Sequence, residues 1–154
     1  MRKWYLLPLL FALVVPTVAV ADDMEKYVEL MRSDLRTSKT ELLTEALKLS
    51  DADGKKFWPI QREYETELAK IQDRRVAMLK DYEASFESMT DQKATEIMKT
   101  AFKLEDERND LVKKYTGKIS KAVSPRVAAR FAQCEKFIQS LTDVAIRGEI
   151  PLHP

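Results

Sequence analysis

The chain has 154 residues, 33% of them charged, and its formal net charge at pH 7 is +1. A chain this close to neutrality has no bulk attraction for nucleic acid, and its single cysteine, Cys134, excludes an internal disulfide. The only histidine, His153, lies beside the C-terminal proline, where an ordered Ser-His-Asp or Cys-His arrangement is not expected. The sequence has no glycine-rich phosphate loop, His-Glu-x-x-His or Cys-x-x-Cys motif. We therefore predict no enzymatic activity and no cofactor.

The N-terminal segment has the pattern of a secretory signal peptide. Two basic residues precede an apolar run over residues 4–18, and Ala19-Val20-Ala21 is a small-x-small cleavage signal. The apolar run is shorter than the roughly 20 residues that a membrane-spanning helix needs. We predict that residues 1–21 are cleaved, that the exported mature chain starts at Asp22, and that it has no stable membrane anchor.

The remaining residues, 22–154, are predicted to form a single all-helical domain. They are rich in Glu, Lys, Leu, Ala and Arg, which favour helix. Apolar residues at 3–4 spacing predict four helices, over about 24–48, 51–88, 90–121 and 124–147, with Gly148 as the residue that follows the last helix.

Three helix starts are marked by capping residues. Ser50, Thr90 and Ser124 each follow an apolar residue, and each is predicted to be an N-cap. Asp53, three residues after Ser50, completes a relative of the capping box. The same stretch, LSDADGKK, also looks like a calcium loop. However, no register places a glycine at position 6 and a glutamate at position 12, so a helix start explains it better than a metal site.

The expected core-facing residues follow from the apolar spacing. They are Tyr27, Met31, Leu35, Leu42, Ala46 and Leu49 in the first helix; Phe57, Tyr64, Leu68, Ile71, Met78, Tyr82 and Phe86 in the second; Ile97, Ala101, Leu104, Leu111, Tyr115 and Ile119 in the third; and Val127, Phe131, Cys134, Ile138, Leu141 and Ala145 in the fourth. Cys134 is interpreted as a small apolar residue of this last stripe.

The two long central helices are predicted to form an antiparallel hairpin over about 51–121, folding back near residues 88–90. This register brings Arg75 close to Glu105, which we predict to form a cross-helix ion pair. At 1.5 Å per residue the hairpin is about 45–55 Å long. So thin a body cannot cover its own apolar surface, so an elongated homodimer or a binding surface is expected.

An exported, all-helical chain with a long hairpin between two such starts resembles the Spy/CpxP-like periplasmic family with LTxxQ motifs, which also includes heavy-metal-resistance sensors. The matching residues are Leu49–Asp53 and, more loosely, Val123–Val127, with Asp53 and Val127 where the family has glutamine. The resemblance implies thin, cradle-shaped dimers. Some members are ATP-independent chaperones with an apolar and basic concave face, and others regulate envelope-stress signalling.

Two functions are therefore expected. The first is a periplasmic holdase for partly unfolded envelope proteins, with Trp58 and Phe102 as client-binding residues and Lys113, Lys114 and Lys118 attracting acidic clients. The second is a regulator or sensor accessory of an envelope-stress or metal-resistance system, which binds one dedicated envelope protein. The metal-sensing branch of the family uses histidine-rich ligands, which this chain lacks, so no metal site is predicted.

Overall fold

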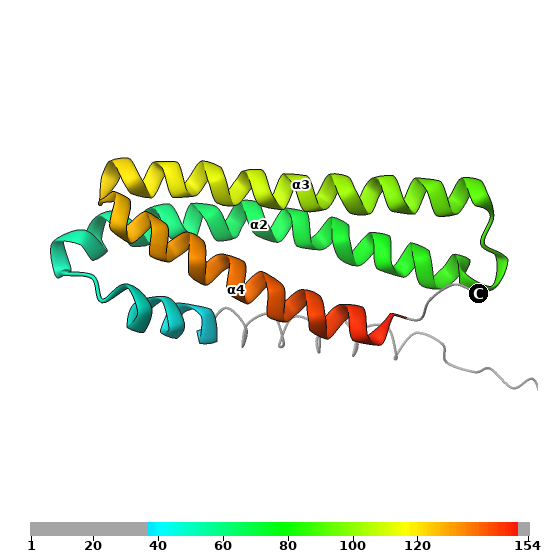
Figure 1. Ribbon diagram of the computed structural model, residues 1–154, viewed down its shortest axis with the longest axis horizontal. Helices are drawn as coiled ribbons and strands as arrows, with labels where there is room; N and C mark the ends of the chain where they lie inside the picture. Colours follow the sequence, from blue (N-terminus) through cyan, green and yellow to red (C-terminus); the bar gives the residue numbers. More distant parts are fainter. Residues whose placement is uncertain (1–36, 151–154) are drawn as a thin grey trace, which may run out of the picture. The chain divides into compact units, whose positions relative to one another are not determined.

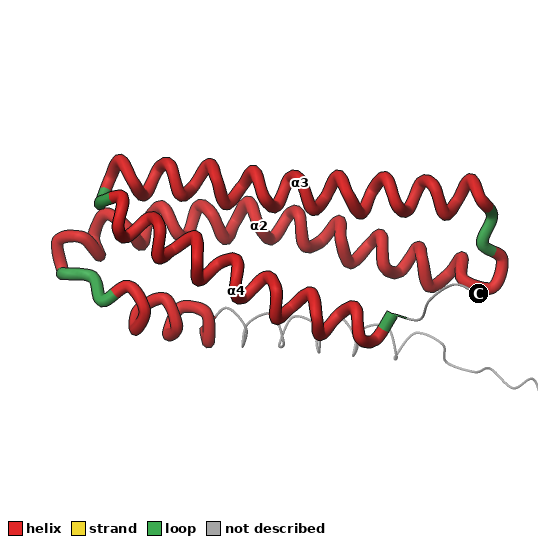
Figure 2. Tube along the Cα trace, viewed as in Figure 1, coloured by secondary structure: helices red, strands yellow, loops and turns green. Residues whose placement is uncertain are grey.

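The computed structural model describes residues 37–150, which include most of the compact unit Lys39–Pro154. In the described part of this unit the elements are a helix over residues 39–47, α2 (Asp51–Ser85), the short 3-10 helix η1 (Phe86–Ser88), α3 (Asp91–Ala122) and α4 (Pro125–Glu149) (Figures 1 and 2). The predicted all-α, four-helix fold is confirmed. The predicted signal peptide, the start of the first helix with Tyr27, Met31 and Leu35, and His153 lie outside the described residues.

The three predicted caps are confirmed by their hydrogen bonds. Each hydroxyl accepts from the backbone N–H three residues on, at 3.2 Å for Ser50, 3.2 Å for Thr90 and 3.3 Å for Ser124. The Ser50 hydroxyl also donates to the Asp53 carboxylate at 3.0 Å, and this carboxylate lies at the positive end of the helix dipole. The prediction for Gly148 is wrong: it lies inside α4 and has no positive φ, so it is not a left-handed C-terminal cap.

Helices α2 and α3 form the predicted antiparallel hairpin (Figure 1). Ion pairs between them mark the register along its length: Lys118 with Glu63 at 2.9 Å, Lys114 with Glu67 at 2.7 Å, Arg74 with Glu107, and Lys93 with Asp81 at 2.7 Å. The direction change falls at η1 and the residues before the Thr90 cap. The hairpin register predicted from the sequence is therefore correct to within a few residues.

The best-packed part of the core is an aromatic cluster, defined as Phe57, Tyr64, Tyr115 and Phe131. All four side chains are fully buried. Tyr64 packs edge-on against both Tyr115 and Phe131, with ring centroids 5.4 Å apart in each pair. Such edge-to-face pairs add stability beyond their buried area. The cluster joins α2, α3 and the first half of α4.

Two predicted stripes are displaced in the structure. In residues 39–47 the buried side chains are Lys39, Leu43 and Leu47, one position beyond the predicted Leu42 and Ala46. Lys39, Leu43 and Leu47 share one helix face because they are spaced at i, i+4 and i+8. This face packs on the bundle with the Lys39 ammonium group paired to acidic partners, as described below.

In α4 the buried side chains are Ala128, Phe131, Glu135 and Gln139. The predicted stripe was right at Phe131, but its later member Leu141 is 56% exposed. Polar groups of α4, rather than its apolar residues, face the hairpin beyond Phe131. The second half of α4 is therefore positioned by hydrogen bonds and charges.

The N-cap of α2 predicts a stability effect. Ser50→Ala removes the hydroxyl that accepts from Asp53 and should lower the free energy of unfolding by about 0.5–2 kcal/mol, measured by urea unfolding followed by circular dichroism. Ser85→Ala is the matched control, because Ser85 precedes η1 but makes no side-chain capping bond. It should change stability by less than about 0.5 kcal/mol. Equal losses in both variants would contradict the capping role of Ser50.

Candidate functional site

Asp143 fixes the second half of α4 against the hairpin. Its carboxylate accepts two hydrogen bonds from the Arg108 guanidinium, at 2.9 and 2.6 Å, and lies 2.7 Å from Nη1 of Arg75. The prediction that Arg75 pairs with Glu105 is therefore wrong. Glu105 lies in the expected neighbourhood but is exposed, whereas Asp143 approaches from a third helix that hairpin register alone could not place.

The charge of Asp143 depends on these arginines. Burial by itself raises the pKa of the carboxyl, but hydrogen bonds and attraction from Arg108 and Arg75 outweigh burial and bring the pKa from 3.8 to about 2. Because the folded-state pKa is the lower one, the stabilisation is present above pH 3.8 and is lost as the pH falls through about 2. Asp143 thus stays ionised at any moderately acidic pH.

Glu135 lies two turns before Asp143 on the same helix, and its pKa is shifted in the opposite direction. Its side chain is 1% exposed. Its Oε2 atom accepts hydrogen bonds from Lys39 Nζ and from the Tyr64 hydroxyl, both at 2.8 Å, whereas its buried Oε1 atom has no hydrogen-bond partner. Burial raises the pKa of Glu135 above 4.5, and the opposing effects of Lys39 and Tyr64 do not cancel it.

An apolar groove lies between the second half of α2 and the C-terminal end of α4. This α2–α4 groove has a volume of about 800 Å³. Its apolar walls are Val76, Leu79, Tyr82 and Phe86 of α2 with Ala145, Ile146 and Ile150 at the end of α4, and its charged rim is Lys80, Glu83 and Glu87. Tyr82 and Phe86 stack edge-on, with ring centroids 5.7 Å apart. The groove has the size and the apolar lining of a binding site.

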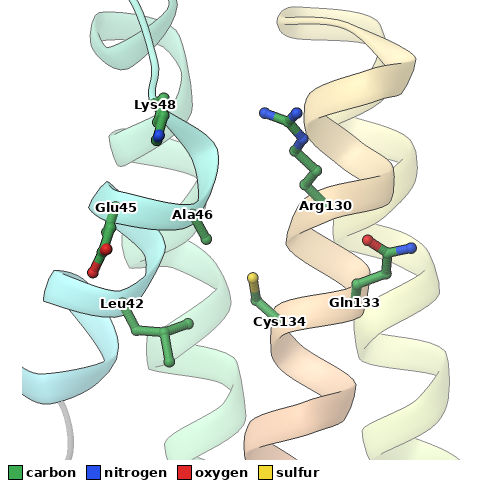
Figure 3. Close-up of a pocket in the computed structure, with 7 residues that line it drawn as sticks. All are labelled: Leu42, Glu45, Ala46, Lys48, Arg130, Gln133 and Cys134. Atoms are coloured by element: carbon green, nitrogen blue, oxygen red, sulfur yellow. The ribbon is translucent and has the colours of Figure 1, made fainter.

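A second pocket, of about 600 Å³, lies between residues 42–48 and α4 (Figure 3). Leu42 and Ala46 on one wall face Cys134 on the other, and Lys48 and Arg130 lie toward one end. Burial, followed by the nearby charge of Glu135, raises the pKa of the Cys134 thiol. This thiol is therefore held in its protonated, less nucleophilic form, in keeping with its predicted apolar role.

The structure does not bring the two predicted client-binding aromatics together. Trp58 is half-buried and packs edge-on against Phe57, at 5.0 Å between ring centroids. Phe102 is 63% exposed on α3. Glu63, five residues after Trp58 on α2, pairs with Lys118 of α3, which marks the level of this end of α2 on α3. Lys118 lies sixteen residues from Phe102 along α3, or about 24 Å. Neither aromatic lines the α2–α4 groove.

The three predicted steering lysines are ion-paired. Lys114 and Lys118 form the hairpin pairs described above, and Lys113 pairs with Asp110 one turn earlier at 2.9 Å. Hydrogen bonds from Lys114 and from the Tyr115 hydroxyl hold the pKa of Glu67 below its ordinary value. Each lysine thus has a local carboxylate that offsets its charge. Their role in attracting clients stays a prediction.

Sequence reasoning missed the groove, although a signal was present. Tyr82 and Phe86 were expected in the core because the apolar stripe of α2, interrupted at Arg75, resumes at Met78 and continues to the end of the helix. The chain that would have to cover this end, after Phe131, carries Glu135, Gln139 and Asp143 at i+4 spacing. An apolar stripe opposite a polar one indicates a surface that these two helices do not fully cover.

Within residues 37–150 there is no group of three or more His, Cys, Asp or Glu side chains that could hold a metal ion. Among the described helices, none has the length and apolar character needed to cross a membrane. No protein family, curated protein or solved structure matches the chain. The site's geometry and chemistry are therefore the basis for proposing a function.

The anchoring of α4 can be tested with a double-mutant cycle. Arg108→Ala and Asp143→Ala should each destabilise the fold because each leaves the other charge partly buried. Their coupling energy should be about 1–3 kcal/mol, measured by urea unfolding. The same cycle on Arg75 and Glu105 is the comparison and should give a coupling within about 0.5 kcal/mol of zero. A large Arg75–Glu105 coupling would restore the pair predicted from the sequence.

Proposed function

We propose that the protein is a periplasmic holdase, which uses the α2–α4 groove to bind apolar segments of partly unfolded envelope proteins without chemical turnover. The observation that carries the proposal is the groove itself: aliphatic and aromatic walls from two helices, left open at the surface, with charges confined to the rim. In a fully covered core, side chains such as Tyr82, Phe86 and Ile146 would be buried, whereas here they are only partly covered.

The chemistry of the lining suits clients of varied sequence. Apolar contact is non-directional and scales with the area removed from water. Few polar groups line the groove walls, so the groove does not demand one hydrogen-bonding pattern from its occupant. The rim presents Lys80 as well as Glu83 and Glu87, so acidic and basic flanking residues of a client can both find a partner.

Large apolar side chains are also exposed outside the groove. Among residues 37–150, five of them are at least 56% exposed, namely Met98, Phe102, Phe137, Leu141 and Val144. Surfaces of this kind mark contacts with other proteins. They are equally suited to the predicted homodimer, which stays a prediction. Export is proposed on the pattern of residues 1–21, and the periplasm as its destination on the resemblance to the Spy/CpxP-like family.

The proposal is tested by suppression of aggregation. The mature chain, starting at Asp22, should prevent reduced lysozyme from aggregating at stoichiometric ratio. Val76→Ser with Ile146→Ser removes apolar contact from both walls of the groove and should weaken capture by at least about tenfold, since a fully buried aliphatic side chain contributes about 1.5–3 kcal/mol. Light scattering gives the protection, and circular dichroism confirms that the variant keeps its helices.

Met98→Ser with Phe102→Ser is the matched control. It also removes two apolar side chains, but from α3 and outside the groove, so protection should persist. If this control loses protection and the groove variant keeps it, the client site lies on α3. That result would agree with the sequence-based prediction that Phe102 binds clients. If the unaltered protein protects no client but binds one envelope protein tightly, the regulator function replaces the holdase.

A further inference from the structure

The helix over residues 39–47 docks on the rest of its unit through a buried lysine and two buried leucines. Lys39 Nζ lies 2.8 Å from Glu135 of α4 and 2.6 Å from Glu65 of α2. Four and eight residues further on, Leu43 and Leu47 are 0% and 2% exposed. The contact at Glu135 thus sits at one end of the surface by which this segment docks.

The groups that face the Glu135 carboxyl come from every element around it. Residues 39–47 contribute Lys39, and α2 contributes the Tyr64 hydroxyl and the more distant charge of Glu65. Neighbours on α4 are Cys134 and Gln139, and α3 contributes the ring of Tyr115, which packs on Tyr64. Lys39 therefore provides the positive charge, while the Oε1 atom remains buried with no hydrogen-bond partner.

The connection between this segment and α2 is short and contains one residue of unusual backbone conformation. Residues 48–50 connect it to α2, and Lys48 has a φ of 45°, in the left-handed region that disfavours side-chain-bearing residues. Separating residues 39–47 from α4 would widen the pocket of Figure 3 and expose Glu135 to water. It would also uncover Leu43 and Leu47, which belong to the apolar core.

We propose that the proton on Glu135 controls the docking of residues 39–47, which bind α2 and α4 more firmly when this carboxyl is protonated and separate more readily when it is ionised. Acidification thus closes this part of the molecule, and neutral pH loosens it. This proposal does not depend on the proposed function, because it concerns a contact within the bundle rather than the groove.

The direction of the pH dependence of docking follows from proton linkage. In the docked state, burial raises the pKa of Glu135 above 4.5, despite the nearby Lys39. In the separated state water solvates the carboxylate and returns its pKa toward the ordinary value. The docked state therefore binds the proton more tightly, and docking weakens as the pH rises from 4.5 through the raised pKa of Glu135. An exposed ion pair would show the opposite trend.

The test is hydrogen exchange of the backbone amides in residues 43–47, followed by mass spectrometry on the mature chain. Glu135→Gln is the key variant, since it keeps an acceptor for Tyr64 and Lys39 but carries no charge. At any one pH, intrinsic exchange rates in residues 43–47 are the same in both proteins. Their rate ratio therefore reports docking alone. The wild type should exchange several-fold faster than Glu135→Gln at about pH 8 and at the same rate near about pH 4.5.

Two further variants identify the titrating group. Lys39→Met removes the charge that lowers the pKa of Glu135, so the midpoint of the pH dependence should move to higher pH. Glu65→Gln removes the other carboxylate that contacts Lys39, and it should keep a pH dependence of the wild-type kind. The proposal would be overturned if the ratio of exchange rates between the wild type and Glu135→Gln did not change with pH. It would also be overturned if residues 43–47 of the wild type were better protected at higher pH. An unmoved midpoint in Lys39→Met, or loss of the pH dependence in Glu65→Gln, would overturn it too.

Discussion

The orientation of α4 depends on two carboxylates on its inner face. Asp143 is held by a two-pronged hydrogen bond from Arg108 and by Arg75, and Glu135 is held by Lys39 and Tyr64. Charged groups with several fixed partners restrict rotation of a helix about its axis far more than apolar contacts do. With both carboxylates turned inward, α4 must turn part of its apolar surface outward, including Leu141.

The two ends of the bundle are stabilised differently. At one end the aromatic cluster of Phe57, Tyr64, Tyr115 and Phe131 fills the space between α2, α3 and α4. Toward the other end the α4 surface that faces the hairpin is polar, and it leaves the apolar residues at the end of α2 incompletely covered. The α2–α4 groove is therefore a consequence of the same charge pairs that position α4.

This arrangement has an energetic cost. Buried polar atoms without a hydrogen-bond partner include Nε of Arg108, Oε1 of Glu135 and Nε2 of Gln139. Each such atom costs part of its hydration free energy without compensation. An apolar inner face on α4 would avoid this cost and would also close the groove. The structure thus combines local destabilisation with an open apolar surface, a combination that is common where proteins bind partners.

Much of the fold is determined by local sequence. The caps at Ser50, Thr90 and Ser124 depend on hydrogen bonds within three residues, and the hairpin register depends on where its single turn falls. Both could be predicted because they involve groups close in the chain or helices joined by a short turn. The candidate site could not, because it depends on how a third helix rotates on the hairpin. Arg75 pairs with Asp143 rather than Glu105, and Lys39 pairs with Glu135, which lies 96 positions further along the chain. No local pattern encodes such long-range pairings, so only the tertiary structure decided which carboxylates are buried and which apolar residues stay at the surface.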